Sequence, residues 1–192
     1  KKYTGSFGIG CFSFFPTKNI TTCEGGMLTT NSMERYIEIK KLIAHGINKD
    51  KKKHFWNREA DLAGHNYRLP NHLAGLGISQ FKQLLKFNKQ RRMIAKKYDN
   101  FFKKLSDKFY VQKVNSNLTH SYQMYSILIN SKYRNNLLYY LKKNNIEASV
   151  HFDPALHQQN YLKKYSKKLP NTEKLAKEII TLPIYPRLKQ ND

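Results

Sequence analysis

The sequence has 192 residues, of which 40% are hydrophobic and 13% aromatic, enough to bury a sizeable core and to exclude a disordered chain. No apolar run approaches the length needed to cross a bilayer, and nothing at the start of the chain resembles a secretory signal. The formal net charge of +22 would suit a polyanionic partner, but the lysines are spread along the whole chain without a zinc-finger, RRM-like or helix-turn-helix pattern.

Apolar residues predict two buried strands near the start of the chain, Phe12–Phe15 and Met27–Thr29, joined by a turn-rich connection. That connection carries Lys18, with Ser13 five residues before it and the pair Gly25-Gly26 behind it. An ammonium group is costly to remove from water, and burial lowers the pKa of a lysine until its amine becomes a nucleophile able to form a Schiff base. Taken by itself, the same pattern also describes an ordinary surface turn.

Two helices are predicted next, separated by a polar connection. Ser32 caps a helix that reaches about His45, and residues 47–65 form the connection. Apolar residues then follow helical spacing from Leu69 to Phe102. This spacing predicts one long helix, or two with a kink, that links a large domain to a smaller one.

After about Asp107 the pattern changes to short strands separated by helices, which is typical of a small α+β domain. The predicted elements are, in order, a strand over His120–Ile129, a helix capped by Ser131 that reaches Asn144, a strand over Ile146–Phe152 and a helix over Thr172–Ile180.

The spacing of histidines and cysteines does not favour a metal site. His151 and His157 have no third ligand nearby, and Cys11 and Cys23 lack metal-ligand spacing. We therefore expect no metal, and we interpret the two cysteines as typical of a reducing, cytoplasmic compartment.

Four segments, taken in order along the chain, carry a family resemblance. They are FSFFPTKNITTCEGGMLTT at residues 12–30, GHNYRLPN at residues 64–71, VHFDPALH at residues 150–157 and TLPIYP at residues 181–186. Together they resemble the DegT/DnrJ/EryC1/StrS family of sugar-nucleotide aminotransferases, which depend on pyridoxal 5'-phosphate (PLP). The resemblance covers nearly the whole chain.

This resemblance implies roles for three residues, and two further residues are candidates from their positions in the matching segments. Lys18 matches the lysine that carries PLP covalently, and Ser13 matches the serine that hydrogen-bonds the cofactor phosphate. Asn66 matches the asparagine that reaches the cofactor phosphate of the neighbouring subunit, which implies a homodimer with shared active sites. Two roles stay open for Arg68, which could contact a phosphate or interact with a helix end. His151 is expected to line the sugar-nucleotide pocket.

The fold class that the resemblance implies is α/β, the aspartate aminotransferase-like fold type I of PLP-dependent transferases. Residues 1–90 would form the C-terminal part of the PLP-binding large domain with the start of the linking helix. Residues 91–192 would form most of the small C-terminal α+β domain. Because the family's other cofactor contacts would precede this segment, the chain is expected to be a fragment that is inactive by itself.

The activity that the resemblance implies is the transfer of an amino group from an amino acid, usually glutamate, to a nucleotide-linked keto-sugar. The acceptor is typically a 4-keto-6-deoxyhexose used for surface polysaccharide or glycan biosynthesis. The expected partners are these two substrates and a second subunit, with no nucleic acid and no membrane.

Two other functions stay open from the sequence. One is a PLP-dependent sugar dehydratase of the same family, although Lys18 argues against it because those enzymes typically have histidine at that position. The other is a basic nucleic-acid-binding module. A salt-dependent mobility shift without a yellow cofactor band would favour the second.

Overall fold

The computed structural model describes residues 3–48, 54–105 and 107–189. The chain divides into two units, unit 1 (Lys1–Leu84) and unit 2 (Leu85–Asp192), and the boundary lies inside one long helix. Within the described residues, unit 1 holds a two-stranded sheet and unit 2 a three-stranded sheet.

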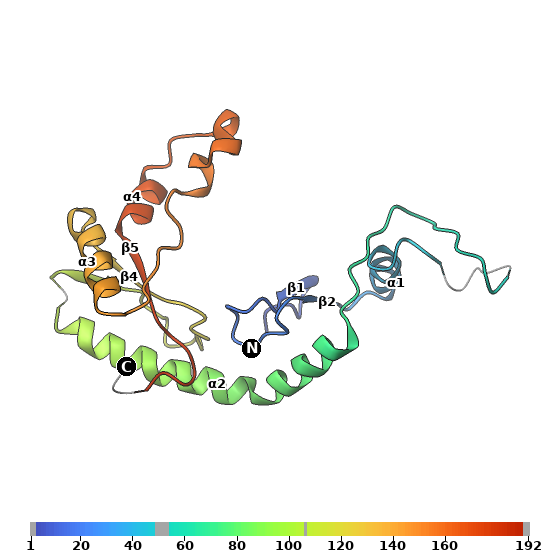
Figure 1. Ribbon diagram of the computed structural model, residues 1–192, viewed down its shortest axis with the longest axis horizontal. Coiled ribbons are helices and arrows are strands. Elements are labelled where there is room, and N and C mark those ends of the chain that lie inside the picture. Colours follow the sequence, from blue (N-terminus) through green and yellow to red (C-terminus); the bar gives the residue numbers. More distant parts are fainter. Residues whose placement is uncertain (1–2, 49–53, 106, 190–192) are drawn as a thin grey trace. The chain divides into compact units, whose positions relative to one another are not determined.

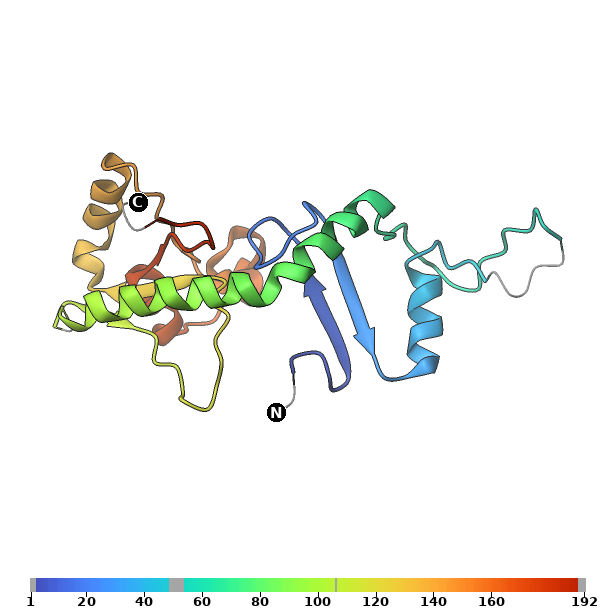
Figure 2. The same cartoon turned by 90° about the horizontal axis from the view of Figure 1, so that it is seen from below.

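Unit 1 begins with an antiparallel pair of strands, β1 (Ile9–Ser13) and β2 (Gly26–Thr30), drawn as neighbouring arrows in Figure 2. The register places Ser13 opposite Gly26, so the connection between the strands starts and ends at one edge of the pair. β2 confirms the second predicted strand. The first was predicted over Phe12–Phe15 but lies earlier, because its last two residues belong to the connection.

These strands are less buried than the sequence predicts. Met27 is 47% exposed and Leu28 is 45% exposed, and within the two strands only Gly10 is buried. Two strands alone cannot cover either face of their sheet. The apolar side chains of β1 and β2 therefore remain at the surface of unit 1.

A short helix, α1 (Met33–Leu42), follows β2 (Figure 2). The predicted cap is confirmed, because Ser32 Oγ accepts a hydrogen bond from the Arg35 N–H at 3.3 Å. The helix ends at Leu42, earlier than the predicted end near His45.

The long predicted helix is confirmed as a single element, α2 (Asn71–Lys103). Its buried residues Arg91, Ala95 and Phe102 lie at helical spacing on the side that packs into unit 2. Arg91 Nη1 donates to the carbonyl oxygen of Ile184 at 2.7 Å, and burial lowers the pKa of this guanidinium below its ordinary value. No helix within the described residues combines the length and apolar character that a membrane crossing needs.

Unit 2 is built on an antiparallel sheet with strand order β3-β4-β5. Its elements are β3 (Phe109–Val111), β4 (Tyr125–Ile129), α3 (Ser131–Lys143), α4 (Pro170–Glu178) and β5 (Ile179–Leu182), with two 3₁₀ helices, η1 (Leu156–Gln158) and η2 (Asn160–Tyr165), before α4. Figure 1 shows α3 and α4 beside β4 and β5. Ile127 and Ile180 are almost fully buried in this sheet and form the centre of the core with Ala95 of α2.

Several sequence predictions for unit 2 are wrong in detail. The predicted strand over Ile146–Phe152 is only an isolated bridge between Ser149 and Thr181. The last predicted helix ends at Glu178, and Ile180 belongs to β5, which pairs with β4.

The strand predicted from His120 begins at Tyr125, and the strand β3 was not predicted. The helix that follows β4 is capped by Asn130 and not by Ser131, because Asn130 Oδ1 accepts from the Lys132 N–H at 2.9 Å.

Candidate functional site

The connection between β1 and β2 is a closed loop tied to one residue, Phe14. The Phe14 N–H donates to the Gly25 carbonyl oxygen at 2.9 Å, and the Phe14 carbonyl oxygen accepts from the Thr22 N–H at 3.0 Å. The Thr21 hydroxyl donates to the same carbonyl oxygen at 2.8 Å. Because Phe14 at the start of the loop is bonded to three residues at its end, the loop between them has a defined conformation.

Lys18 and Ser13 are both attached to the backbone of Phe15 in this loop. The Lys18 N–H donates to the Phe15 carbonyl oxygen at 3.0 Å, and Ser13 Oγ accepts from the Phe15 N–H at 3.3 Å. Lys18 is half-buried, and Ser13 is exposed. The structure therefore links the backbone of Lys18 and the hydroxyl of Ser13, the two residues that the sequence singled out, through a single intervening residue.

Thr22 and Gly25 hold the far side of the loop. Thr22 is 1% exposed, and its hydroxyl donates to the Glu24 carbonyl oxygen at 2.7 Å. A Cβ at Gly25, where φ is +141°, would lie 2.8 Å from both Thr22 Oγ1 and Leu69 Cδ1. Thr22 is a site residue that the sequence does not reveal, because a threonine in a polar turn carries no pattern that distinguishes a buried one from an exposed one.

Asn66 and Arg68 lie on a second segment of unit 1, beside the end of α1. The backbone of Asn66 pairs with Ala44 in an isolated bridge, and the Tyr67 N–H donates to the Ile43 carbonyl oxygen at 3.0 Å. Asn66 Oδ1 accepts from Arg68 Nε at 3.0 Å, and both side chains are exposed. The structure thus brings these two candidate residues together, with the guanidinium oriented by the amide.

Arg68 also lines a small pocket of about 400 Å³, which we call the basic pocket. Lys40, Lys41 and Tyr36 of α1 line it as well, with the apolar side chains of Ile37 and Ile43. Lys41 Nζ is 2.7 Å from Asp61 Oδ2, so one of the three cations is already paired. The pocket combines cationic groups with one aromatic ring, a composition that suits an anionic ligand with a planar part.

His151 lies in unit 2, apart in sequence from the other four candidates. Its Nδ1 is 3.0 Å from the hydroxyl of Thr181, a buried residue, and 3.3 Å from the hydroxyl of Ser149. The described residues contain no group of three His, Cys, Asp or Glu side chains that could hold a metal ion. His157 is engaged with Glu173, its Nε2 lying 3.3 Å from Oε1.

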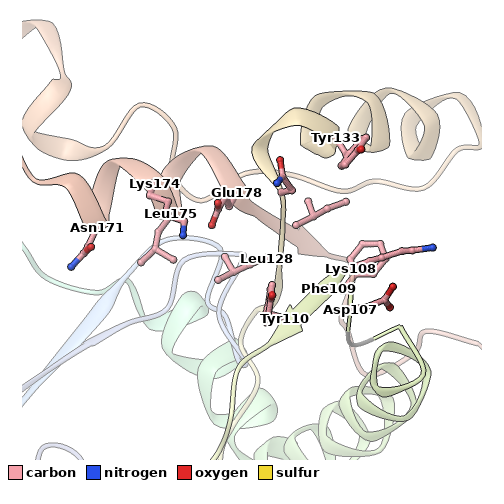
Figure 3. Close-up of a pocket in the computed structure, with 12 residues that line it drawn as sticks. Asp107, Lys108, Phe109, Tyr110, Leu128, Tyr133, Asn171, Lys174, Leu175 and Glu178 are labelled. Atoms are coloured by element: carbon pink, nitrogen blue, oxygen red, sulfur yellow. The ribbon is translucent and has the colours of Figure 1, made fainter.

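A wider pocket of about 1160 Å³ lies in unit 2, where polar and apolar side chains from β3, β4 and α4 line it. Figure 3 shows Lys174, Leu175 and Glu178 of α4 on one side of it and Tyr110 below. None of the five candidate residues lines this pocket. Neither the sequence motifs nor a polar cluster assigns it a function.

Solved structures of aminotransferases have the same fold as this chain. PseC from Helicobacter pylori, an aminotransferase involved in the biosynthesis of pseudoaminic acid, is 30% identical with a TM-score of 0.85, covering 99% of this chain and 53% of that one. Spr1654 from Streptococcus pneumoniae, solved in its PLP form, has a TM-score of 0.84 at 22% identity, over 100% of this chain and 50% of that one. The predicted fold class, a PLP-dependent transferase of fold type I, is thereby confirmed.

The sequence comparison defines the family. The model of the DegT/DnrJ/EryC1/StrS aminotransferase family matches residues 1–192, and this chain belongs to that family. GDP-perosamine synthase from Escherichia coli O157:H7 is 35% identical over 189 residues, which cover 97% of this chain and 50% of that protein. The chain spans about half the length of the curated relatives that it matches.

Proposed function

We propose that the protein containing this chain transfers an amino group from an amino acid to a nucleotide-linked keto-sugar. The observation that carries the proposal is the half-buried Lys18 on a loop whose first residue, Phe14, is hydrogen-bonded to Thr22 and Gly25 at its end. The names of the relatives support the same class of reaction, since one is GDP-perosamine synthase and another is an aminotransferase of pseudoaminic acid biosynthesis.

The residues of this loop fit PLP as the cofactor. A primary amine at Lys18 can bind an aldehyde covalently, and the exposed hydroxyl of Ser13 can donate to a phosphate. The close packing of Gly25 against Thr22 leaves no room for a side chain there, which keeps the loop near its neighbours. When bound, PLP supplies an electron sink for the carbon that gains or loses the amino group.

Lys18 and Asn66 would then have distinct roles. After the amino-acid substrate displaces it, the Lys18 amine would be free to take a proton from the substrate carbon and return it, as a positioned general base and acid does. Asn66 would donate its side-chain amide to the cofactor phosphate of the neighbouring subunit, in a homodimer with shared active sites. Because one site serves both halves of the reaction, we expect ping-pong kinetics.

The basic pocket supports a diphosphate-bearing acceptor. Arg68 and Lys40 line it beside Lys41, which is paired with Asp61, and guanidinium and ammonium groups bind phosphate oxygens through charge-assisted hydrogen bonds. We propose a 4-keto-6-deoxyhexose linked to a nucleotide as the acceptor and glutamate as the donor. His151 would line the sugar part of the acceptor site.

We also propose how the chain fits the family's domains. Residues 1–90 would belong to the PLP-binding large domain and residues 91–192 to the small domain, within a cytoplasmic enzyme. The division of the described chain after Leu84, inside α2, supports such a boundary in the linking helix.

The decisive experiment replaces Lys18 with alanine in the full-length protein. We expect loss of the visible absorbance of the bound cofactor and a fall in amino transfer of at least about 1000-fold, because the covalent link and the proton carrier disappear together. A matched control is Lys82→Ala, which removes an exposed lysine of α2 from the same unit. Retention of the absorbance band and of turnover by Lys18→Ala would refute the assignment.

Mixing two inactive variants tests the shared site. If Asn66 of one subunit completes the site that holds Lys18 of the other, mixed dimers of Lys18→Ala and Asn66→Ala contain one intact site. Statistical subunit exchange should then restore about a quarter of the wild-type activity. If the mixture stays as inactive as the separate variants while dimers exchange, each subunit builds its own site.

A further inference from the structure

The solvent-facing side of α2 in unit 2 carries a set of exposed lysines, which we call the lysine face. It consists of Lys86, Lys89, Lys96, Lys97 and Lys103, with Lys104 directly after the helix. All six side chains are exposed, and none forms an ion pair with another of the residues that the structure describes. At 1.5 Å per residue the lysine face extends for about 25 Å along the helix.

The packing of α2 fixes which way this face points. Arg91, Ala95 and Phe102 are buried in the core of unit 2 and anchor the opposite side of the helix. The one acidic residue of α2, Asp99, is turned toward the sheet, where its Oδ1 accepts from the Tyr125 hydroxyl at 2.6 Å. Asp99 also lines a small surface pocket with Lys96, so it is the one carboxylate of this helix beside the lysine face.

Although no membrane is expected among the partners from the sequence, we propose that the lysine face binds the anionic headgroups of a phospholipid bilayer and holds the protein at a membrane surface. Six ammonium groups on one side of a helix can approach a flat anionic surface together, and each contributes about a fivefold increase in partitioning. The proposal concerns peripheral attachment, which needs no helix that crosses the bilayer.

The chemistry of the face favours lipid headgroups over a nucleic acid. Its cations are lysines, which act as point charges, with the single exception of Arg92 beside Lys96, whereas arginine is the residue that binds defined phosphates and bases with two parallel hydrogen bonds. Leu85 and Met93 are 83% and 57% exposed, and at 100° per residue they flank Lys89 on the same side of the helix. Apolar side chains among lysines can enter the headgroup region, while they have no partner along a phosphate backbone.

The test is co-sedimentation of the full-length protein with vesicles of phosphatidylcholine alone and with vesicles that contain about one-third phosphatidylglycerol. We expect binding only to the anionic vesicles, and its loss as the screening length falls from about 10 Å at 0.1 M salt to about 3 Å at 1 M. Equal binding to both vesicles, or none to either, would overturn the proposal.

Two sets of substitutions distinguish the lysine face from the general charge of the chain. Changing Lys86, Lys89, Lys96 and Lys103 to glutamine should weaken vesicle binding by more than about 100-fold, and the double variant Lys89→Gln/Lys96→Gln by about 25-fold. The matched control changes four exposed lysines elsewhere in unit 2, namely Lys142, Lys143, Lys163 and Lys167.

Circular dichroism of each variant checks that the fold is retained, and the graded double variant keeps the test valid if the quadruple one unfolds. Equal losses in the control and the quadruple variant would assign the binding to net charge and overturn the proposal. The protein could instead shift the mobility of RNA or DNA at concentrations at which it does not bind anionic vesicles. That result would overturn the proposal and identify nucleic acid as the partner.

Discussion

The two units of this chain are stabilised in different ways. In unit 2, Ile127, Ile180 and Ala95 are at most 1% exposed, and the sheet packs with α2 and α3 around a continuous core. In unit 1, the strands carry exposed apolar residues such as Met27 and Leu28. The loop with Lys18 is held there mainly by backbone hydrogen bonds.

This difference has a consequence for function. Four of the five candidate residues, Ser13, Lys18, Asn66 and Arg68, lie in unit 1, where few apolar side chains are buried. A hydrogen-bonded loop with little core beneath it depends on its close contacts, such as that of Thr22. We therefore expect that substitutions in unit 2 change the stability most, whereas substitutions near the loop change cofactor binding most.

The largest expected effect is in the core of unit 2. Ile127→Ala should lower the free energy of unfolding by about 2–5 kcal/mol, because it removes apolar contacts and leaves a cavity. Met27→Ala, the matched change in unit 1, should cost less than about 1 kcal/mol, since Met27 is already 47% exposed.

Urea denaturation of both variants, followed by circular dichroism, measures the two costs. Comparable losses for Ile127→Ala and Met27→Ala would mean that β2 is covered in solution. The contrast between the two units would then disappear.

A smaller effect is expected where α2 passes the loop in unit 1. A Cβ at Gly77 would lie 2.9 Å from Thr22 Cγ2, and the Thr22 side chain is fixed by its bond to Glu24. Gly77→Ala should therefore cost about 1 kcal/mol in spite of the better helix propensity of alanine, and it should weaken PLP binding.

Gly75 provides the matched control on the same helix. No heavy atom lies within 4 Å of the position its Cβ would take. Gly75→Ala should stabilise the protein by about 0.5–1 kcal/mol and leave cofactor absorbance unchanged. Thermal melts and cofactor titrations check both variants, and identical behaviour of the pair would show that Thr22 does not constrain the loop.

The sequence predicted helices well and short strands less well, for physical reasons. α2 repeats its apolar spacing over many turns, so its pattern is strong, and Ser32 caps α1 through a local bond that the sequence reveals. Ile180 was assigned to a helix because its pairing with β4 involves residues far away in the chain. The segment 146–152 has the apolar residues of a strand but finds only one bridge to a partner strand.

In the candidate site too, features that depend on residues close in sequence could be predicted, whereas contacts between distant segments could not. Ser13 and Lys18 lie close in sequence, and the motif that contains them predicted a loop that the structure shows to be closed. The hydrogen bond between Asn66 and Arg68 could not be predicted, because it depends on how the segment folds against α1. The burial of Thr22 depends on contacts with α2, so it too cannot be predicted from the residues next to Thr22 in the sequence.

The smallest expected effect concerns pH and the start of α4 in unit 2. Glu173 Oε1 accepts from the Leu169 N–H at 2.8 Å and lies 3.3 Å from His157 Nε2. The backbone bond first, and then the bond with His157, lower the pKa of this carboxyl below its usual range. A carboxylate whose pKa is lower in the folded protein stabilises the fold above the unfolded pKa, and this contribution is lost as the pH falls through the folded pKa.

Glu173→Gln should therefore reduce the melting temperature slightly at neutral pH and flatten the decline of the melting temperature between about pH 5 and pH 3. Glu147→Gln, at an exposed position, should do neither. Melting curves across this pH range compare the variants, and an unchanged acid decline in Glu173→Gln would mean that the pair does not anchor α4.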